Sequence, residues 1–178
     1  MNESDNQKLT LRQPTTMDAG WMWRLVRETG VLDSNSCYLY LLLCRDFSES
    51  CIVAEDGSRI VGFISGYRPP ETPNTLFIWQ VGVSQSARRR GIALRMLISL
   101  VDRCRQQQGL EYVEATVTAD NQASRRLFEK YANANRLDIN EETGFVESEF
   151  VFGGHDAEPR LRIGPLNTTE LRISELAP

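Results

Sequence analysis

One stretch of this sequence constrains the fold more than any other: an apolar run, a short basic turn and an amphipathic pattern follow one another between residues 75 and 108. Residues 75–83 are apolar on both faces and predict a central β-strand. From Gly91 to Gln108, apolar residues recur on one helical face, which predicts a helix packed on a sheet. Residues 112–117 predict the next strand, so the unit should form a right-handed parallel crossover.

Shorter patterns predict further elements on both sides of this unit. Strands are expected at residues 9–12, 144–152 and 160–163, a hairpin at 51–55 and 59–67, and helices at 17–29 and 121–134. The leucine-rich run 38–44 favours a short buried helix by its length, with a strand as the alternative. Strands and helices that follow one another without a repeat or a linker predict a single α/β (α+β) domain.

Length and composition narrow the class of protein. A chain of 178 residues suits one domain, predicted at residues 9–166 between a disordered lead at 1–8 and a C-terminal tail at 167–178. Its four cysteines lack the spacing of a zinc site, so we expect buried free thiols and no metal. A net charge of −4 argues against a nucleic-acid partner. No export signal and no run of about 18 apolar residues occurs, so we expect a cytoplasmic protein with no membrane partner.

The turn before the predicted helix has the chemistry of an anion site. A helix start leaves about four amide groups without acceptors, and these groups attract anions together with the helix dipole. Gly91 lets the backbone approach a phosphate, and the run Arg-Arg-Arg at residues 88–90 adds positive charge. A basic run alone is more often solvated surface, but this one joins a central strand to an amphipathic helix. The glycine loop of nucleotide triphosphatases and the Gly-x-Gly-x-x-Gly pattern of dinucleotide sites are both absent.

At this turn the chain resembles the Gcn5-related N-acetyltransferase superfamily, whose acetyl-CoA loop reads Gln/Arg-x-x-Gly-x-Gly/Ala. Arg88, Gly91 and Ala93 match that loop. Residues 79–83 are similar to the superfamily's central strand, where a bulge splays the sheet, and Gly82 is the expected bulge. The resemblance implies acetyl-CoA as cosubstrate, a mixed and mostly antiparallel twisted sheet with helices on both faces, and a homodimer. The cofactor-binding residues that it implies are Val81, Val83, Arg88, Arg89, Arg90, Gly91, Ile92, Ala93, Asn121, Ser124 and Phe128.

Two features depart from the superfamily pattern. The tyrosine that commonly protonates the leaving thiolate stands seven residues after the asparagine, where this chain has Phe128. Tyr131 lies one turn later and is the candidate substitute, with a core role as the alternative. Residues 132–143 form an insertion that we expect to shape the pocket or the dimer.

Four segments carry a narrower resemblance. Residues 32–44, 61–67, 77–81 and 153–158 are similar to those superfamily members that acetylate L-2,4-diaminobutyrate on the ectoine pathway. The implied reaction transfers acetyl from acetyl-CoA to the 4-amino group and gives N4-acetyl-L-2,4-diaminobutyrate. The alternatives are an acetyltransferase of another small amine, and an acetyl-CoA-binding module without catalysis.

Acetyl transfer to an amine needs a group that removes the ammonium proton, because an alkyl ammonium has a pKa of about 10.4. Glu158 and the lone histidine, His155, are the candidates, and His155 could instead only orient Glu158. Asp33 is the expected ammonium partner, with a helix cap as its alternative role. The substrate-binding candidates are Asp33, Ser34, Asn35, Tyr38, Trp79 and Gln80, although aromatic residues in apolar runs are more often core residues.

Overall fold

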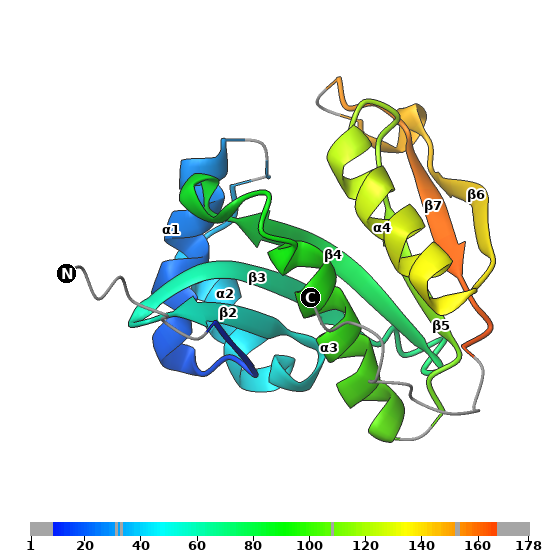
Figure 1. Cartoon of the computed structure of the whole chain (residues 1–178). Helices are drawn as coiled ribbons and strands as arrows, with labels where there is room; N and C mark the ends of the chain where they lie inside the picture. The colour runs from blue at the N-terminus through cyan, green and yellow to red at the C-terminus, as the bar shows by residue number, and fades with distance from the viewer. Residues whose placement is uncertain (1–8, 31, 33, 108, 152–153, 167–178) are drawn as a thin grey trace.

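Seven strands of the described chain form one sheet in the order β1-β2-β3-β4-β5-β7-β6 (Figure 1). The computed structural model describes residues 9–30, 32, 34–107, 109–151 and 154–166, so the predicted lead and tail lie outside the described residues. The strands are β1 (Thr10–Arg12), β2 (Ile52–Asp56), β3 (Arg59–Tyr67), β4 (Thr75–Val83), β5 (Tyr112–Thr116), β6 (Ile139–Phe145) and β7 (Glu158–Ile163). The helices are α1 (Ala19–Thr29), α2 (Cys37–Asp46), α3 (Ile92–Gln106) and α4 (Gln122–Asn135), with 3-10 turns at Thr16–Asp18, Ser48–Ser50, Gln85–Ala87 and Glu147–Glu149.

The sheet is mixed and mostly antiparallel, as predicted. Strand β4 is central and pairs in parallel with β5, while the remaining neighbours pair antiparallel. Helix α3 connects the two parallel strands, which confirms the predicted crossover. The leucine-rich run forms α2, so the helix was the correct alternative for that segment.

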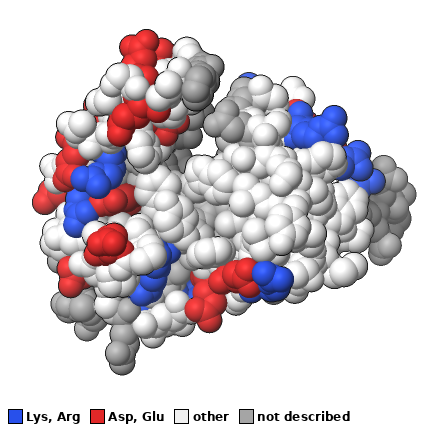
Figure 2. Space-filling view, turned by 180° about the vertical axis from the view of Figure 1, so that it is seen from behind, with Lys and Arg blue, Asp and Glu red and all other residues white. Residues whose placement is uncertain are grey.

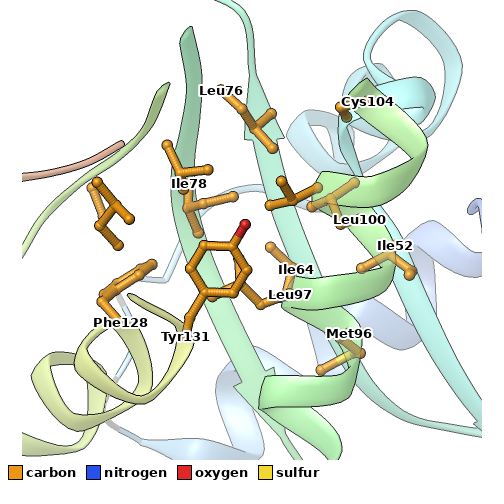
Figure 3. Packing of buried hydrophobic residues seen from close by; sticks show 14 of the residues in the cluster. Ile52, Ile64, Leu76, Ile78, Met96, Leu97, Leu100, Cys104, Phe128 and Tyr131 are labelled. Atoms are coloured by element: carbon orange, nitrogen blue, oxygen red, sulfur yellow. The ribbon is translucent and has the colours of Figure 1, made fainter. Parts of the chain in front are cut away.

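Helices cover both faces of the sheet. One buried cluster joins α1 and α2 to the face that carries Val53 and Phe63. The larger cluster joins α3 and α4 to the opposite face, and Figure 3 shows Leu97 and Leu100 of α3 packed over Ile64. This arrangement buries the apolar stripe of each helix and positions the N-terminus of α3 beside the end of β4.

Strands β4 and β5 diverge after a short paired stretch. Their pairing begins at Thr75 with Tyr112 and ends at Phe77 with Glu114, although β4 continues to Val83. Figure 1 shows β5, β6, β7 and α4 leaning away from the rest of the sheet beyond this point. The sheet is therefore splayed, as the resemblance implied.

The bulge that accompanies this splay lies at Trp79. Ser65 of β3 pairs with Gln80 and Gly66 pairs with Ile78, so Trp79 is the extra residue of β4. The bulge shifts the alternation of the strand: Leu76 and Ile78 belong to the α3 cluster before it, and Val81 and Val83 pack against that cluster after it.

The prediction of a bulge at Gly82 was wrong. Gly82 pairs in regular register with Phe63. Its lack of a side chain serves packing instead, because a Cβ there would lie 2.5 Å from Cε1 of Phe63 and 3.2 Å from Cδ2 of Leu25.

The prediction of a strand at residues 144–152 was also wrong. The strand is β6, which begins at Ile139, and Glu147–Glu149 form a 3-10 turn. The predicted insertion therefore supplies the end of α4 and most of β6. The pattern failed because β6 is an edge strand that pairs only with β7 and exposes much of its length, so its sequence needs no apolar alternation.

The four cysteines are free thiols, and Cys44, Cys51 and Cys104 are buried, as predicted. Burial raises the pKa of Cys44 to about 12 and that of Cys51 to about 11. Among the described residues, no helix has the length and apolar content needed to cross a bilayer.

Candidate functional site

A row of backbone amides points to an anion site at the start of α3. The first helical hydrogen bond of α3 is donated by the amide of Arg95 to the carbonyl of Gly91, at 3.1 Å. The amides of residues 89–94 have no acceptor in the described part of the chain. Gly91 has a φ of +69° and Arg89 a φ of +64°, so two left-handed residues curve this turn. We call residues 88–94 the cradle.

The cradle suits a diphosphate. Six amide donors lie in one turn where the dipole of α3 is positive, and no described atom lies within 4 Å of where a Cβ of Gly91 would stand. Arg88 and Arg89 are exposed beside it. Arg90 is also exposed, but its guanidinium lies 2.6 Å from the carboxylate of Asp56 in the hairpin between β2 and β3.

The remaining predicted cofactor residues lie along the splay. Val81 and Val83 are half-buried on the α3 side of β4. Asn121 caps α4, because its Oδ1 accepts a hydrogen bond of 3.1 Å from the amide of Ser124. Ser124 is half-buried and Phe128 is fully buried among the α3 and α4 side chains.

Tyr131 lies in the same core cluster as Phe128. Only 3% of its surface is exposed, and Figure 3 shows its hydroxyl oxygen pointing away from α4. Burial, and then the negative charge of Asp102, raise the pKa of this phenol above its usual value. Tyr131 therefore holds its proton across the physiological range.

Glu158, His155 and Thr116 form a connected polar group beyond the point where β5 diverges from β4. The hydroxyl of Thr116 donates to Oε2 of Glu158 at 2.5 Å, and Nε2 of His155 lies 3.5 Å from Oε1 of the same carboxylate. The His155 ring stacks on Phe150 with centroids 4.3 Å apart. Viewed from behind, the surface is hollowed between the part that carries β6 and β7 and the part that carries α1 and α2 (Figure 2).

The hydrogen bond of His155 indicates which ring nitrogen carries a proton. Nδ1 lies 2.8 Å from the carbonyl oxygen of Asp156, and a carbonyl only accepts, so Nδ1–H is the donor. Nε2 is then the ring atom that can accept a proton, and it faces Glu158. Nε2 and the carboxylate of Glu158 therefore face each other across 3.5 Å.

The predicted substrate residues that the structure describes lie in the loop before α2, on α2 and on β4. Asp33 lies outside the described residues, and the N-cap of α2 is Ser36. Tyr38 is exposed in the first turn of α2, and Trp79 is 40% exposed at the bulge. Ser34 is exposed and Asn35 is half-buried, with its carbonyl accepting from the indole nitrogen of Trp23 at 3.0 Å.

Gln80 is placed differently from the other substrate candidates. It is only 4% exposed, and its Oε1 accepts a hydrogen bond of 2.9 Å from the hydroxyl of Tyr40, which is fully buried. Gln80 is thus held by Tyr40 next to the bulge at Trp79. Its contact with a substrate stays a prediction.

The structure joins some predicted residues by direct contact and not others. It connects His155 with Glu158 and Asn121 with Ser124, and it gathers residues 88–93 in one turn. Thr116 and Asp56 were missed. A signal for Thr116 existed only in the pairing of β5 with β7, which the sequence does not specify.

Comparison with known proteins gives a consistent result. The model of the acetyltransferase (GNAT) family matches residues 19–133. The chain is 43% identical over 162 residues to the L-2,4-diaminobutyric acid acetyltransferase of Shouchella clausii (strain KSM-K16), covering 90% of this chain and 89% of the relative. It is 41% identical over 160 residues to the protein of the same name from Streptomyces coelicolor (strain ATCC BAA-471 / A3(2) / M145), covering 89% and 94%.

A solved structure agrees with these relatives. Diaminobutyrate acetyltransferase EctA from Paenibacillus lautus, in complex with its substrate L-2,4-diaminobutyric acid and coenzyme A, superposes with a TM-score of 0.85. That protein is 40% identical in sequence, and the match covers 93% of this chain and all of the other.

Proposed function

The chain belongs to the acetyltransferase (GNAT) family, and we propose that it transfers the acetyl group of acetyl-CoA to the 4-amino group of L-2,4-diaminobutyrate. The product is N4-acetyl-L-2,4-diaminobutyrate, formed for ectoine biosynthesis. The observation that carries this proposal is the cradle, whose amides have no acceptor among the described residues, beside the splayed strands of a chain about 40% identical to named enzymes of this activity.

Acetyl-CoA supplies the thioester, and the cradle holds its diphosphate. The amides of residues 89–94 and the guanidinium of Arg88 bind the phosphate oxygens. The edge of β4 that β5 leaves unpaired beyond Phe77 offers backbone groups to the pantetheine arm, alongside Val81 and Val83. Backbone held in this way aims the thioester at the hollow without a reorganisation of side chains.

Glu158 removes the proton from the substrate ammonium. An alkyl ammonium with a pKa of about 10.4 is protonated at neutral pH and cannot attack the thioester until that proton leaves. Glu158 is half-buried, and its Oε1 faces Nε2 of His155, so the accepted proton has a second site nearby. The amide bond then forms as the carbon–sulfur bond breaks.

Tyr131 is our candidate for the general acid that protonates the leaving thiolate. Its raised pKa keeps the phenol protonated, as a general acid requires. Phe128 occupies the position that carries the tyrosine in many superfamily members and has no proton to give. The packing of Tyr131 in the core is the competing role.

Selectivity for diaminobutyrate needs partners for its 2-ammonium and its carboxylate. Asp33 is our candidate for the ammonium, and Ser34, Asn35, Tyr38 and Trp79 for the remaining contacts. We also propose a cytoplasmic location, as expected from the sequence, and a homodimer, which the superfamily resemblance implies. Light scattering of the purified protein checks the dimer.

The decisive experiment compares amines. Release of CoA from acetyl-CoA is followed with diaminobutyrate, a polyamine, an aminoglycoside and a peptide with a free N-terminus. Diaminobutyrate should give the highest kcat/KM by about 100-fold or more, with NMR placing the acetyl group on N4. A higher kcat/KM for another amine would identify that amine as the substrate in place of diaminobutyrate. Tight binding of acetyl-CoA without CoA release for any amine would favour the non-catalytic module.

A further inference from the structure

Thr116 contacts Glu158 from the strand that diverges from β4. It is the last residue of β5 and lies two positions beyond Glu114, where the pairing with β4 ends. From the contact between Thr116 and Glu158 we infer that Thr116 is a positioning residue, which holds the carboxylate in the orientation that accepts the amine proton. This inference rests on the proposed function of Glu158.

The strand register explains why the two side chains meet. Thr116 pairs with Arg160 of β7, and the amide of Val117 donates to the carbonyl of Pro159 at 3.0 Å. Glu158 is two residues before Arg160, so its side chain lies on the same face and diagonal to Thr116. Threonine is β-branched and stiff at χ1, which fixes the direction of its hydroxyl.

The two oxygens of Glu158 have different partners. Oε2 accepts from Thr116 at 2.5 Å, while Oε1 faces His155 at 3.5 Å. A carboxylate held at one oxygen cannot rotate freely about its last bond, so the other oxygen keeps its direction. The hydrogen bond from Thr116 therefore keeps Oε1 directed toward His155.

The nearest arginine of β7 does not hold this carboxylate. The guanidinium of Arg160 lies 2.6 Å from Glu142 and 3.9 Å from Glu114. The partner of Oε2 is thus the neutral hydroxyl of Thr116, which fixes the oxygen without adding a positive charge beside a group that must accept a proton.

The test is a double-mutant cycle with Thr116→Val and Glu158→Gln. Thr116→Val should lower kcat about tenfold and leave the KM for acetyl-CoA unchanged, because a hydrogen bond to a charged group is lost. Thr116→Ser keeps the hydroxyl and should retain most of the activity. In the Glu158→Gln background, Thr116→Val should have no further effect, since a residue that acts through the carboxylate has nothing left to position.

Thr118→Val is the matched control. Its hydroxyl donates to Asp120 at 2.6 Å, so the variant loses the same kind of contact two residues away. Wild-type kcat in Thr116→Val, or losses that multiply in the double variant, would overturn the inference. If Thr116→Val fails to fold in a thermal melt, Thr116→Ala provides the second hydroxyl-free variant.

The outcome also separates this inference from the proposed function. If the wild-type protein acetylates a different amine, the substrate assignment fails and the cycle is measured with that amine. If it acetylates no amine, both proposals fail together.

Discussion

The guanidinium of Arg90 lies 2.6 Å from the carboxylate of Asp56, so the hairpin between β2 and β3 holds one of the three arginines of the cradle. Arg88 and Arg89 have no such partner among the described residues. The contact engages the guanidinium of Arg90 with an opposite charge. The three arginines are therefore unequal as phosphate ligands.

Arg88→Ala should raise the KM for acetyl-CoA about tenfold, because a charge-assisted hydrogen bond to phosphate is removed. Arg90→Ala should raise it only about twofold, since its charge is already engaged by Asp56. Steady-state kinetics at varied acetyl-CoA concentration measure both. Equal effects of the two substitutions would show that Arg90 leaves Asp56 when the coenzyme binds.

Gly91→Asp should abolish binding of acetyl-CoA, because a carboxylate enters a site built for phosphate. Gly91 also has a φ of +69°, where a side chain costs roughly 1–3 kcal/mol. Gly109→Asp is the control: Gly109 has a φ of +77° and open space around it, but it lies beyond the opposite end of α3. Calorimetric titration should show lost affinity only for Gly91→Asp. Normal affinity in that variant would place the diphosphate elsewhere.

Glu158→Gln should lower kcat by about 10²–10⁴-fold and spare the KM for acetyl-CoA. Glutamine keeps an acceptor for the hydroxyl of Thr116 but cannot take a proton at neutral pH. His155→Ala should have a smaller effect, because His155 faces the carboxylate with Nε2 and, in our proposal, is only the second holder of the proton. The opposite ranking of the two kcat values would make His155 the primary base.

The parts of the molecule that the sequence predicted well are those where burial imposes a period. Strand β4 is buried or half-buried at every position except Trp79, and α3 is buried on one stripe, so their residue patterns are strong and the turn between them could be located. Strand β6 pairs along one edge and exposes much of its surface, and its position was missed. The bulge was assigned to Gly82 because glycine marks bulges, although that glycine makes room for Phe63.

The candidate site also has one part that the sequence predicts and one part that it does not. The cradle is local, since its amides, glycine and arginines lie within one short turn that can be read directly from the chain. The contact of Thr116 with Glu158 joins residues 42 positions apart and depends on the register of β5 against β7. Register is fixed by packing of the whole sheet, so no pattern near Thr116 indicates its partner.

Asp18 provides a prediction about stability and pH. Its buried carboxylate accepts two hydrogen bonds of 2.8 Å from the guanidinium of Arg12 and one of 2.8 Å from the amide of Thr15. The bonds from Arg12 are the main cause that holds the pKa of Asp18 below its usual value, while burial opposes them. The folded protein thus binds this proton less readily than the unfolded chain does.

Stability from Asp18 is present above the unfolded pKa, near 3.9, and is lost as the pH falls through the lower folded value. Asp18→Asn should cost about 2 kcal/mol at neutral pH and weaken the loss of stability in acid. Urea unfolding between neutral pH and about pH 3 measures both effects. Asp46→Asn is the control, because Asp46 pairs with Arg45 on the surface and should change little. Equal losses in the two variants would contradict the role of the buried pair.

Gly82 and Gly20 should respond in opposite directions to the same substitution. A Cβ on Gly82 would lie 2.5 Å from the ring of Phe63, which is fully buried and packed in the α1 and α2 cluster. Gly82→Ala should therefore destabilise the fold by about 1–3 kcal/mol, because the ring must shift within a filled core. Gly20 lies in α1 with no atom within 4 Å of the added carbon, so Gly20→Ala should stabilise by about 0.5–1 kcal/mol through helix propensity. Thermal melts of the two variants give the signs directly. A neutral Gly82→Ala would mean that β4 and Phe63 can move apart, and the regular pairing of Gly82 with Phe63 would then not be fixed by their packing.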